Sequence, residues 1–494
     1  MSGPPLLPQA VGLQPREYQT EGIRFFFDRK RGLNRDDPGL GKTIQAALAA
    51  VPPVLVVCPN YLVGQWGEWL NNHLPGCRTV VAKGDRWAKQ EQIFAFAGMS
   101  LKGWDPKRFK AALTAEQPAQ FLVINKEMLR THYSELMTVA PVLHTMIIDE
   151  SHHMRNRDAE VSKRAFDISK IVPRVYELSA TPIWKEADDL YAQLRMLYPT
   201  AFTSYNTFCD DYLVFDETRF GRVVYGVKRE KQEAFDAMLS IMVLGRTYKQ
   251  VSRELPPVME DEVWVQFDKE HRALYDDAIT NYRVKFAGDD GEDLFLSSMS
   301  AVMHTLRQIC GWHGKIDAIK DILEDTKVYD KGRVVIFCWY RETARLLGEA
   351  FPGAPVITGA ITDPAERRRV AQAAERSGLP VIATLASLSE GVDLSWARHV
   401  IFAEEHYAPG SHTQSLARVV RERQLDGTEI PPASTDPWDL VLKALDSRAA
   451  NAEPVLVHYV NVKDSIDENI HRTARRRNAT IRTVLREALG MAGL

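Results

Sequence analysis

The sequence has little cysteine, and its cysteines form no pattern. Five occur among 494 residues, with no C-x-x-C pair and no histidine cluster at the spacing of metal ligands. They stand at Cys58, Cys77, Cys209, Cys310 and Cys338. Neither a disulfide framework nor a zinc site is therefore indicated. Isolated thiols fit a reducing compartment.

Long apolar runs and an excess of one charge are also missing. The longest apolar stretch, 46–58, is interrupted by Pro52 and Pro53 and is shorter than the ~20 residues that span a bilayer. Residues 1–10 lack the basic start of a secretory signal. We therefore expect a cytoplasmic protein with no membrane partner. Because the formal net charge is only −3, any nucleic-acid surface must be a local patch.

The chain does contain short runs rich in Val, Ile and Leu, with helical stretches between them. These runs occupy 54–57, 121–124, 145–148, 175–178, 334–337, 356–358, 381–383, 400–403 and 455–460. Short apolar strands that alternate with helices predict parallel sheets covered on both faces. Because the runs fall into two groups, we expect an α/β fold with two parallel-sheet lobes.

Between the two groups, from 184 to 312, the strand pattern fades. The segments 191–198, 231–244 and 269–286 are better suited to helices. We therefore expect a helical insertion that joins the lobes. The polar, proline-containing segment 425–453 is expected to be a surface excursion.

A glycine-containing loop, DDPGLGKT at 36–43, precedes an Ala-rich helix expected at 44–50. Glycine lets backbone N–H groups close around phosphates, and a helix N-terminus adds partial positive charge. Lys42 would contact the β- and γ-phosphates of ATP, and Thr43 would bind Mg²⁺. Asp36 stands where the general pattern has its first glycine, so a chance surface turn remains an alternative for this motif alone. The other residues expected at the nucleotide are Asp37, Gly39, Leu40 and Gly41.

A second motif, TMIIDESH at 145–152, lowers the weight of that alternative. Apolar residues followed by two acids describe a buried strand that delivers carboxylates at its C-terminal end, where open α/β sheets bind ligands. Asp149 would hold Mg²⁺, usually through water, and Glu150 would orient or deprotonate the attacking water. A strand that ends in a solvated acidic turn is the alternative for this motif by itself.

With these two motifs in place, the sequence resembles the superfamily-two helicases, and more narrowly their Swi/Snf-type branch of DNA-dependent ATPases. LSATP at 178–182 is similar to the family's motif III, and the resemblance implies that Ser179 and Thr181 link hydrolysis to movement of the second lobe. It also implies two RecA-like lobes, at 11–202 and 313–494, with the helical insertion and linker at 203–312.

Two further segments resemble parts of the family's first lobe. Residues 13–19 are similar to the adenine-recognising segment, in which Gln19 would read the base edge; an ordinary helix start is the alternative. Residues 58–66 resemble motif Ia, whose loop contacts the nucleic-acid backbone in relatives. Tyr61 and Trp66 of this segment could equally be core aromatics, and for Trp66 we favour the core.

The later segments continue the resemblance. The basic and then Leu-Pro stretch 244–257 is typical of Swi/Snf-type proteins, whereas 333–337 and 389–394 resemble motifs IV and V. Residues 402–410 are similar to a segment of the annealing-helicase branch, with Tyr407 where tryptophan is usual. The segment 457–468 is similar to the family's closing strand and the brace helix after it.

The segment 414–424 fits motif VI, Q-x-x-x-R-x-x-R-x-x-Q. On a helix, Gln414, Arg418 and Arg421 lie four and three residues apart and share one face. The resemblance implies that Gln414 lies at the nucleotide, and that Arg421 and Arg418 act as arginine fingers on the γ-phosphate. A basic solvated helix face is the alternative.

From these segments we expect an ATPase that binds ATP and Mg²⁺ between its two lobes and moves along double-stranded DNA. A strand-separating DNA or RNA helicase is the rival among enzymes. A non-catalytic adaptor that binds nucleic acid with a degenerate motor fold is the rival from another class. Intact Lys42, Asp149, Glu150 and Arg421 argue against the adaptor.

Overall fold

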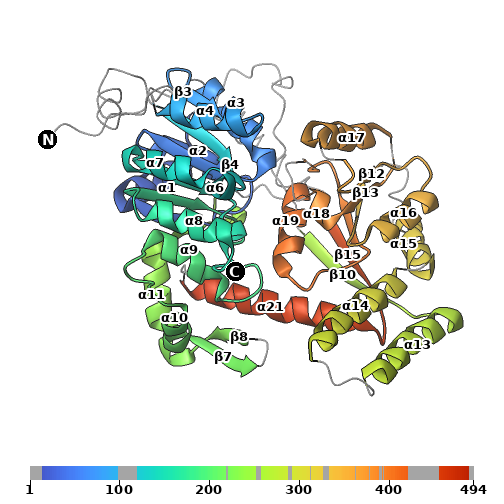
Figure 1. Cartoon of the computed structure of the whole chain (residues 1–494). Helices are drawn as coiled ribbons and strands as arrows, with labels where there is room; N and C mark the ends of the chain where they lie inside the picture. Colours follow the sequence, from blue (N-terminus) through green and yellow to red (C-terminus); the bar gives the residue numbers. More distant parts are fainter. Residues whose placement is uncertain are drawn as a thin grey trace, which may run out of the picture. The chain divides into compact units, whose positions relative to one another are not determined.

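The computed structural model divides into two compact units, each built on a parallel sheet with helices on both faces (Figure 1). Unit 1 comprises Met1–Val251 and Ala479–Leu494, and unit 2 comprises Ser252–Asn478. The residues described are 14–97, 120–218, 221–251, 258–286, 292–311, 313–325, 333–361, 363–377, 379–388, 392, 394–420 and 455–488. The expectation of two α/β lobes with parallel sheets is confirmed.

The sheet of unit 1 has seven strands in the order β3-β4-β2-β5-β6-β1-β9, and all neighbouring strands are parallel. The strands are β1 (Arg31–Asn34), β2 (Val54–Cys58), β3 (Arg78–Val81), β4 (Gln120–Asn125), β5 (Thr145–Asp149), β6 (Arg174–Leu178) and β9 (Val243–Leu244). The four runs predicted for this half of the chain are β2, β4, β5 and β6. Because every pair is parallel, all carboxyl ends meet at one edge of the sheet.

Helices cover both faces of this sheet. On one face lie α1 (Glu17–Arg29), α2 (Lys42–Ala49) and α3 (Val63–His73). On the other face lie α4 (Arg86–Phe96), α6 (Met128–Thr131), α7 (Tyr133–Val139), α8 (Glu160–Ser169) and α9 (Asp189–Leu197). Every residue of β2 is buried, which explains its continuously apolar sequence.

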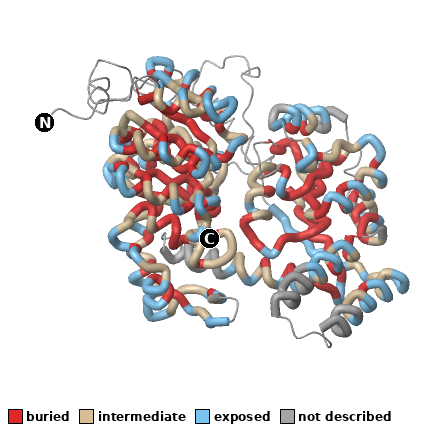
Figure 2. The backbone as a smooth tube through the Cα atoms, in the orientation of Figure 1, coloured by how far each residue is buried: buried red, intermediate tan, exposed pale blue. Residues whose placement is uncertain are grey.

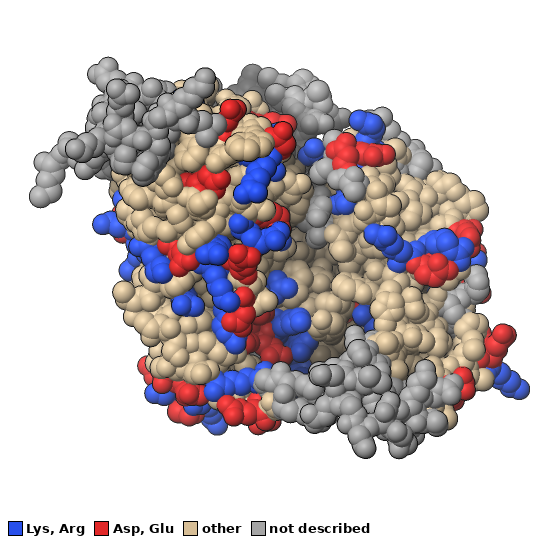
Figure 3. All heavy atoms as spheres, in the orientation of Figure 1, with Lys and Arg blue, Asp and Glu red and all other residues tan. Residues whose placement is uncertain are grey.

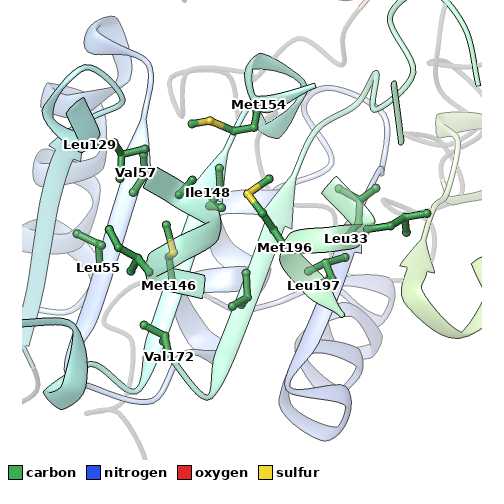
Figure 4. Close-up of a cluster of buried hydrophobic side chains, with 14 of the residues drawn as sticks. Leu33, Leu55, Val57, Leu129, Met146, Ile148, Met154, Val172, Met196 and Leu197 are labelled. Atoms are coloured by element: carbon green, nitrogen blue, oxygen red, sulfur yellow. The ribbon is translucent and has the colours of Figure 1, made fainter. Parts of the chain in front are cut away.

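Alternation along the strands divides the core of unit 1 into two clusters. Val54 and Val56 of β2 face the cluster with α1, α2 and α3, whereas Leu55 and Val57 face the opposite cluster. Figure 4 shows part of the second cluster, in which Val57 lies near Ile148 of the neighbouring strand. Figure 2 shows the same arrangement as buried strands inside a shell of more exposed helices.

The stretch 203–251, the part of the expected insertion that lies in unit 1, contains both helices and strands. It holds α10 (Tyr205–Tyr212), the antiparallel hairpin β7 (Leu213–Thr218) and β8 (Gly221–Val227), α11 (Gln232–Met242), β9 and α12 (Tyr248–Val251). The helices expected at 191–198 and 231–244 are present as α9 and α11. The hairpin was missed because β7 is mostly exposed, so its pattern does not stand out as a buried strand, and β9 was missed because it is two residues long and continues the apolar pattern of α11.

The sheet of unit 2 has six strands in the order β10-β15-β14-β11-β13-β12, again all parallel. They are β10 (Val258–Val265), β11 (Val334–Cys338), β12 (Val356–Ile357), β13 (Val381–Thr384), β14 (His399–Phe402) and β15 (Val455–Val462). All five runs predicted for this half are confirmed as strands. β10 was missed because, at the edge of the sheet, most of its side chains are exposed.

The helices of unit 2 cover both faces of its sheet. They are α13 (Lys269–Phe286), α14 (Glu292–Cys310), α15 (His313–Asp325), α16 (Arg341–Ala350), α17 (Pro364–Ser377), α18 (Leu385–Leu388), α19 (Pro409–Val419) and the part of α21 (Ile466–Ala488) up to Asn478, since unit 1 includes the rest of that helix. α15 and α16 pack on one face, and α17, α18 and α19 pack on the other. The segment 425–453 lies outside the described residues. Within the described part of the chain, no helix combines the length and apolar character needed to cross a membrane.

Candidate nucleotide-binding site

The glycine-containing loop lies at the carboxyl edge of the unit 1 sheet, between β1 and α2. Gly39 and Gly41 have φ of 91° and 76°, the left-handed region that disfavours a Cβ. Gly41 is the N-cap of α2, and a Cβ added there would lie 2.5 Å from Gln19 Nε2. Backbone N–H groups therefore gather at the start of a helix, as a phosphate-binding loop requires.

Lys42 begins α2, and its ammonium lies against the loop itself. Its Nζ donates to the backbone oxygens of Asp36 at 2.6 Å and Asp37 at 3.2 Å. Burial lowers the pKa of Lys42, while the charges of Glu150, Asp36 and Asp149 oppose that shift. The structure thus brings Lys42 close to the two acids at the end of β5, Asp149 and Glu150, and its contact with phosphates stays a prediction. Thr43 follows in the first turn of α2.

Gln19 lies on α1 beside the same loop. Its Nε2 donates to the backbone oxygen of Leu40 at 3.3 Å, and its Oε1 accepts the backbone N–H of Arg16 at 2.9 Å. The side chain is buried. The structure therefore places Gln19 at the expected site, and its contact with a base edge stays a prediction.

Asp149 is the last residue of β5 and Glu150 follows it, and the Asp149 carboxylate is held at both oxygens. Oδ1 accepts the backbone N–H of Glu150 at 2.9 Å, and Oδ2 accepts Nε1 of Trp66 at 2.8 Å. Burial and the charge of Glu150 raise the pKa of Asp149 to about 6, whereas the Trp66 hydrogen bond and Lys42 oppose the shift. Trp66 is a buried core residue, as we favoured, but its second role as a donor to Asp149 was missed.

A chain of contacts joins Glu150 to the LSATP segment. His152 Nδ1 lies 3.2 Å from Glu150 Oε2 and 3.1 Å from Ser179 Oγ, which accepts the backbone N–H of Thr181 at 3.2 Å. The His152 ring stacks on Trp184, with centroids 5.0 Å apart and an angle of 12° between the planes. Ser179 and Thr181 therefore connect to the acidic motif through His152, a residue to which the sequence reasoning gave no role.

Polar side chains continue along the same edge at the ends of β2 and β4. The turn Asn60–Leu62, expected to contact nucleic acid, connects β2 to α3, and Asn60 Oδ1 accepts Asn125 Nδ2 at 3.1 Å. Lys126 Nζ lies 3.2 Å from His153 Nδ1. Figure 3 shows basic and acidic side chains mixed on the visible face of unit 1, in keeping with the small net charge.

In unit 2, Gln414 and Arg418 lie one turn apart on α19, and both are half-buried. The backbone oxygen of Arg418 accepts the N–H of Leu394 at 3.0 Å, which joins α19 to the segment before β14. Arg421, the other expected finger, lies outside the described residues, as do Gly391 and Asp393 of the motif V segment. The roles of these residues toward a nucleotide stay predictions.

Comparison with known proteins gives two family matches. Residues 18–314 match the SNF2-related domain, and residues 314–423 match the helicase conserved C-terminal domain.

Three curated relatives are similar over most of the chain. It is 25% identical over 454 residues to a protein of Caenorhabditis elegans named SWI/SNF-related matrix-associated actin-dependent regulator of chromatin subfamily A-like protein 1 homolog, covering 87% of this chain and 60% of that one. It is 22% identical to the human DNA annealing helicase and endonuclease ZRANB3, covering 86% and 38%. It is 24% identical to the Zorya protein ZorD of Escherichia coli, covering 79% and 38%. The chain thus spans 60% or less of the length of these relatives.

A solved structure, the Sulfolobus solfataricus SWI2/SNF2 ATPase core in complex with dsDNA, aligns with 97% of this chain and 98% of its own at 18% identity. The TM-score of the alignment is 0.41, so we base no argument on this likeness.

Proposed function

The chain belongs to the SNF2-related family, and from this membership we propose that it is a nucleic-acid-dependent ATPase that uses ATP hydrolysis to move along double-stranded DNA. The observation that carries the proposal is the meeting of Lys42, Asp149 and Glu150 at one sheet edge. Charged groups are costly to bury unless they are paired or used. A purely structural adaptor has no need to keep these three together.

The residues around the loop fit a magnesium nucleotide. The N–H groups at the start of α2 suit phosphate oxygens, and Lys42 would exchange its two backbone carbonyls for the β- and γ-phosphates. The Thr43 hydroxyl and the Asp149 carboxylate are oxygen donors of the kind that Mg²⁺ prefers. When bound, Mg²⁺ would neutralise charge that develops on the phosphates.

We assign Glu150 the task of orienting and deprotonating the attacking water. Its φ of 50° is uncommon outside glycine, and such backbone strain gathers at functional sites. Its carboxylate lies 3.2 Å from His152, which also reaches Ser179. A change in charge at Glu150 during hydrolysis would therefore alter the hydrogen bonds between His152 and the LSATP segment.

We assign the α19 arginines to the stabilisation of charge on the transferring phosphate. Arg418 lies on α19 beside Gln414 in the motif VI register, and Arg421 follows in sequence. Arginines in this role contribute about a thousandfold or more to the rate. Unit 1 would thus bind the nucleotide, and hydrolysis would require unit 2.

Double-stranded DNA is the track that we propose. The human relative is named as a DNA annealing helicase, and the stretch 244–257 follows the Swi/Snf pattern. Phosphate contacts would dominate binding, so we expect it to be salt-sensitive and largely independent of sequence.

The test compares ATP hydrolysis in the presence of duplex DNA, single-stranded DNA and RNA of the same length and sequence. We expect duplex DNA to stimulate most, and the stimulation to fall as salt rises. A preference for RNA or single strands would favour a strand-separating helicase instead. Hydrolysis that no nucleic acid stimulates would refute the proposal.

The variant Glu150→Gln tests whether the protein is an ATPase or a non-catalytic adaptor. It should keep ATP binding and lose turnover, because the amide cannot accept the proton of water. Glu160→Gln, at an exposed ion pair with Arg164 on α8, is the matched control and should hydrolyse ATP like the wild type. Equal turnover in both variants would place the base elsewhere.

A further inference from the structure

A buried ion pair holds the start of the phosphate loop. The Asp36 side chain is fully buried, and its Oδ1 accepts both the backbone N–H and Nε of Arg246 at 3.0 Å. Its Oδ2 accepts Arg246 Nη2 at 2.7 Å, Gln45 Nε2 at 2.9 Å and Asn34 Nδ2 at 3.3 Å. The acid that makes the phosphate-loop pattern irregular therefore has a dedicated partner 210 residues away.

Arg246 makes further contacts from the same guanidinium. Its Nη2 donates to Gln45 Oε1 on α2 at 2.9 Å, and its Nη1 donates to the backbone oxygen of Tyr18 on α1. A Cβ added at Gly22 would lie 1.7 Å from Gln45 Oε1 and 3.0 Å from Arg246 Nη2, so α1 approaches the pair as closely as glycine allows. One side chain thus joins two helices, the loop and the segment after β9.

The backbone reinforces this connection. The N–H of Arg35 donates to the oxygen of Leu244 at 2.7 Å, and the N–H of Asp37 donates to the oxygen of Arg246 at 2.9 Å. These bonds extend the parallel pairing of β1 with β9 to the edge of the loop. A displacement of the segment 244–246 would therefore move residues 35–37 with it.

The same network sets the direction of the loop's peptide groups. Gln45 Nε2, which also holds Asp36, donates to the Leu40 oxygen at 3.2 Å, and Gln19 Nε2 donates to the same oxygen at 3.3 Å. Holding that carbonyl on the protein side leaves neighbouring N–H groups to face the ligand. Lys42 Nζ donates to the backbone oxygen of Asp36 at 2.6 Å. The ion pair that holds Asp36 therefore also fixes the position of the Lys42 ammonium.

We propose that Arg246 is a positioning residue for the nucleotide, and that it couples the phosphate loop to the segment 243–251 through which the chain leaves unit 1 for unit 2. Nucleotide binding then stiffens this segment, and a displaced segment weakens nucleotide binding by the same free energy, because coupling is reciprocal. This inference rests on the proposed function, since it requires ATP at the loop.

The first test measures nucleotide affinity and steady-state kinetics for Arg246→Lys. Lysine keeps the charge but lacks the planar guanidinium that donates hydrogen bonds to Asp36, Gln45 and Tyr18 at the same time. We expect Kd for ADP and KM for ATP to rise about tenfold, the loss of one charge-assisted hydrogen bond, with a smaller change in kcat. Arg164→Lys, in an exposed pair with Glu160, is the matched control and should change neither value.

The second test is hydrogen exchange of the peptide covering 243–251, with and without saturating ADP. In the wild type, ADP should slow the exchange of this peptide. In Asp36→Asn, which keeps the shape of the side chain and removes its charge, saturating ADP should slow it less. Thermal unfolding of each variant shows whether it is folded.

The outcomes separate the two levels of the argument. Wild-type protein that binds no nucleotide would overturn the proposed function. Wild-type protein that binds ADP, together with an Arg246→Lys variant of unchanged affinity and a 243–251 peptide that ignores ADP, would overturn the inference alone. A folded Arg246→Lys variant with a raised Kd, and protection that depends on Asp36, would establish the coupling.

Discussion

Replacing Trp66 by Phe should raise the magnesium concentration that ATP hydrolysis requires. Trp66 Nε1 donates to Asp149 Oδ2 at 2.8 Å, and the backbone N–H of Glu150 holds the other oxygen. Together these two donors fix the plane of the carboxylate that would hold Mg²⁺. Phe keeps an aromatic ring in the core but removes the donor, so only one oxygen of the carboxylate stays held and its plane is no longer fixed.

The expected magnitude follows from the kind of bond that is lost. A hydrogen bond to a charged group contributes about 1.5–3 kcal/mol, and about 1.4 kcal/mol corresponds to a factor of ten. Changes to groups that orient metal ligands typically cost about 10–100-fold in metal affinity or activity. We therefore expect the Mg²⁺ concentration for half-maximal hydrolysis to rise about tenfold or more.

The assay measures hydrolysis against Mg²⁺ concentration at fixed ATP, and thermal unfolding reports any loss of packing. Trp69→Phe is the matched control, since Trp69 lies on the same helix and packs against the same core, but its ring lies beside His73, in a tilted arrangement, instead of holding Asp149. Equal Mg²⁺ dependence in the wild type and a folded Trp66→Phe variant would refute the reasoning. So would an equally large shift in Trp69→Phe.

Two further predictions follow from backbone geometry and charge. Gly41→Ala should weaken ATP binding about tenfold or more, because the φ of Gly41 is 76° and a Cβ there would lie 2.5 Å from Gln19 Nε2. Gly64→Ala is the control, since a Cβ at Gly64 would meet nothing nearer than 4.0 Å. Equal ATP affinities of the two variants in titration calorimetry would contradict this prediction. Burial opposes the charge of His471, but its hydrogen bonds to the carboxylates of Glu405 and Glu262, together with the charges of those two acids, outweigh burial and raise the pKa of His471. The native state then holds a proton that the unfolded state releases, so this stability is full below the unfolded pKa and is lost as pH rises through the folded pKa. Chemical denaturation between pH 6 and 9 should show a smaller decline in the free energy of unfolding for His471→Gln than for the wild type, and identical slopes would count against this role.

The fold could be predicted where strands are buried on both faces. β5 is a continuous apolar run because helices cover both sides of it, and its place in a parallel sheet followed from that pattern. β10 has the opposite character, since it lies at an edge with exposed acids at 260–262 and takes its strand form from pairing with β15. A local apolar pattern indicates a buried strand, and an edge strand with few buried side chains lacks that pattern.

The site could be predicted where its residues are neighbours in sequence. Lys42, Asp149 and Glu150 stand in short motifs whose chemistry is local. The partners that orient them are distant, because Trp66 is 83 residues from Asp149 and Arg246 is 210 residues from Asp36. No pattern within a single sequence links such distant positions, because only the folding of the chain brings them together.

The structure also distinguishes the carboxylate that we propose as a Mg²⁺ ligand from its counterpart in unit 2. Both β5 and β14 end in an apolar run followed by two acids and a nearby histidine, DESH at 149–152 and EEH at 404–406. Glu404 is buried, its Oε2 accepts the N–H groups of Trp339 and Tyr340 at 2.7 and 2.9 Å, and its Oε1 accepts Thr343 Oγ1 at 2.7 Å. Those donors fix the start of α16. Each Asp149 oxygen accepts one donor, which leaves lone pairs for a metal ion or water. Glu404 thus accepts three hydrogen bonds within the protein and Asp149 accepts two, so the number of donors, rather than the strand-acid-acid pattern, favours Asp149 as the carboxylate that would bind Mg²⁺.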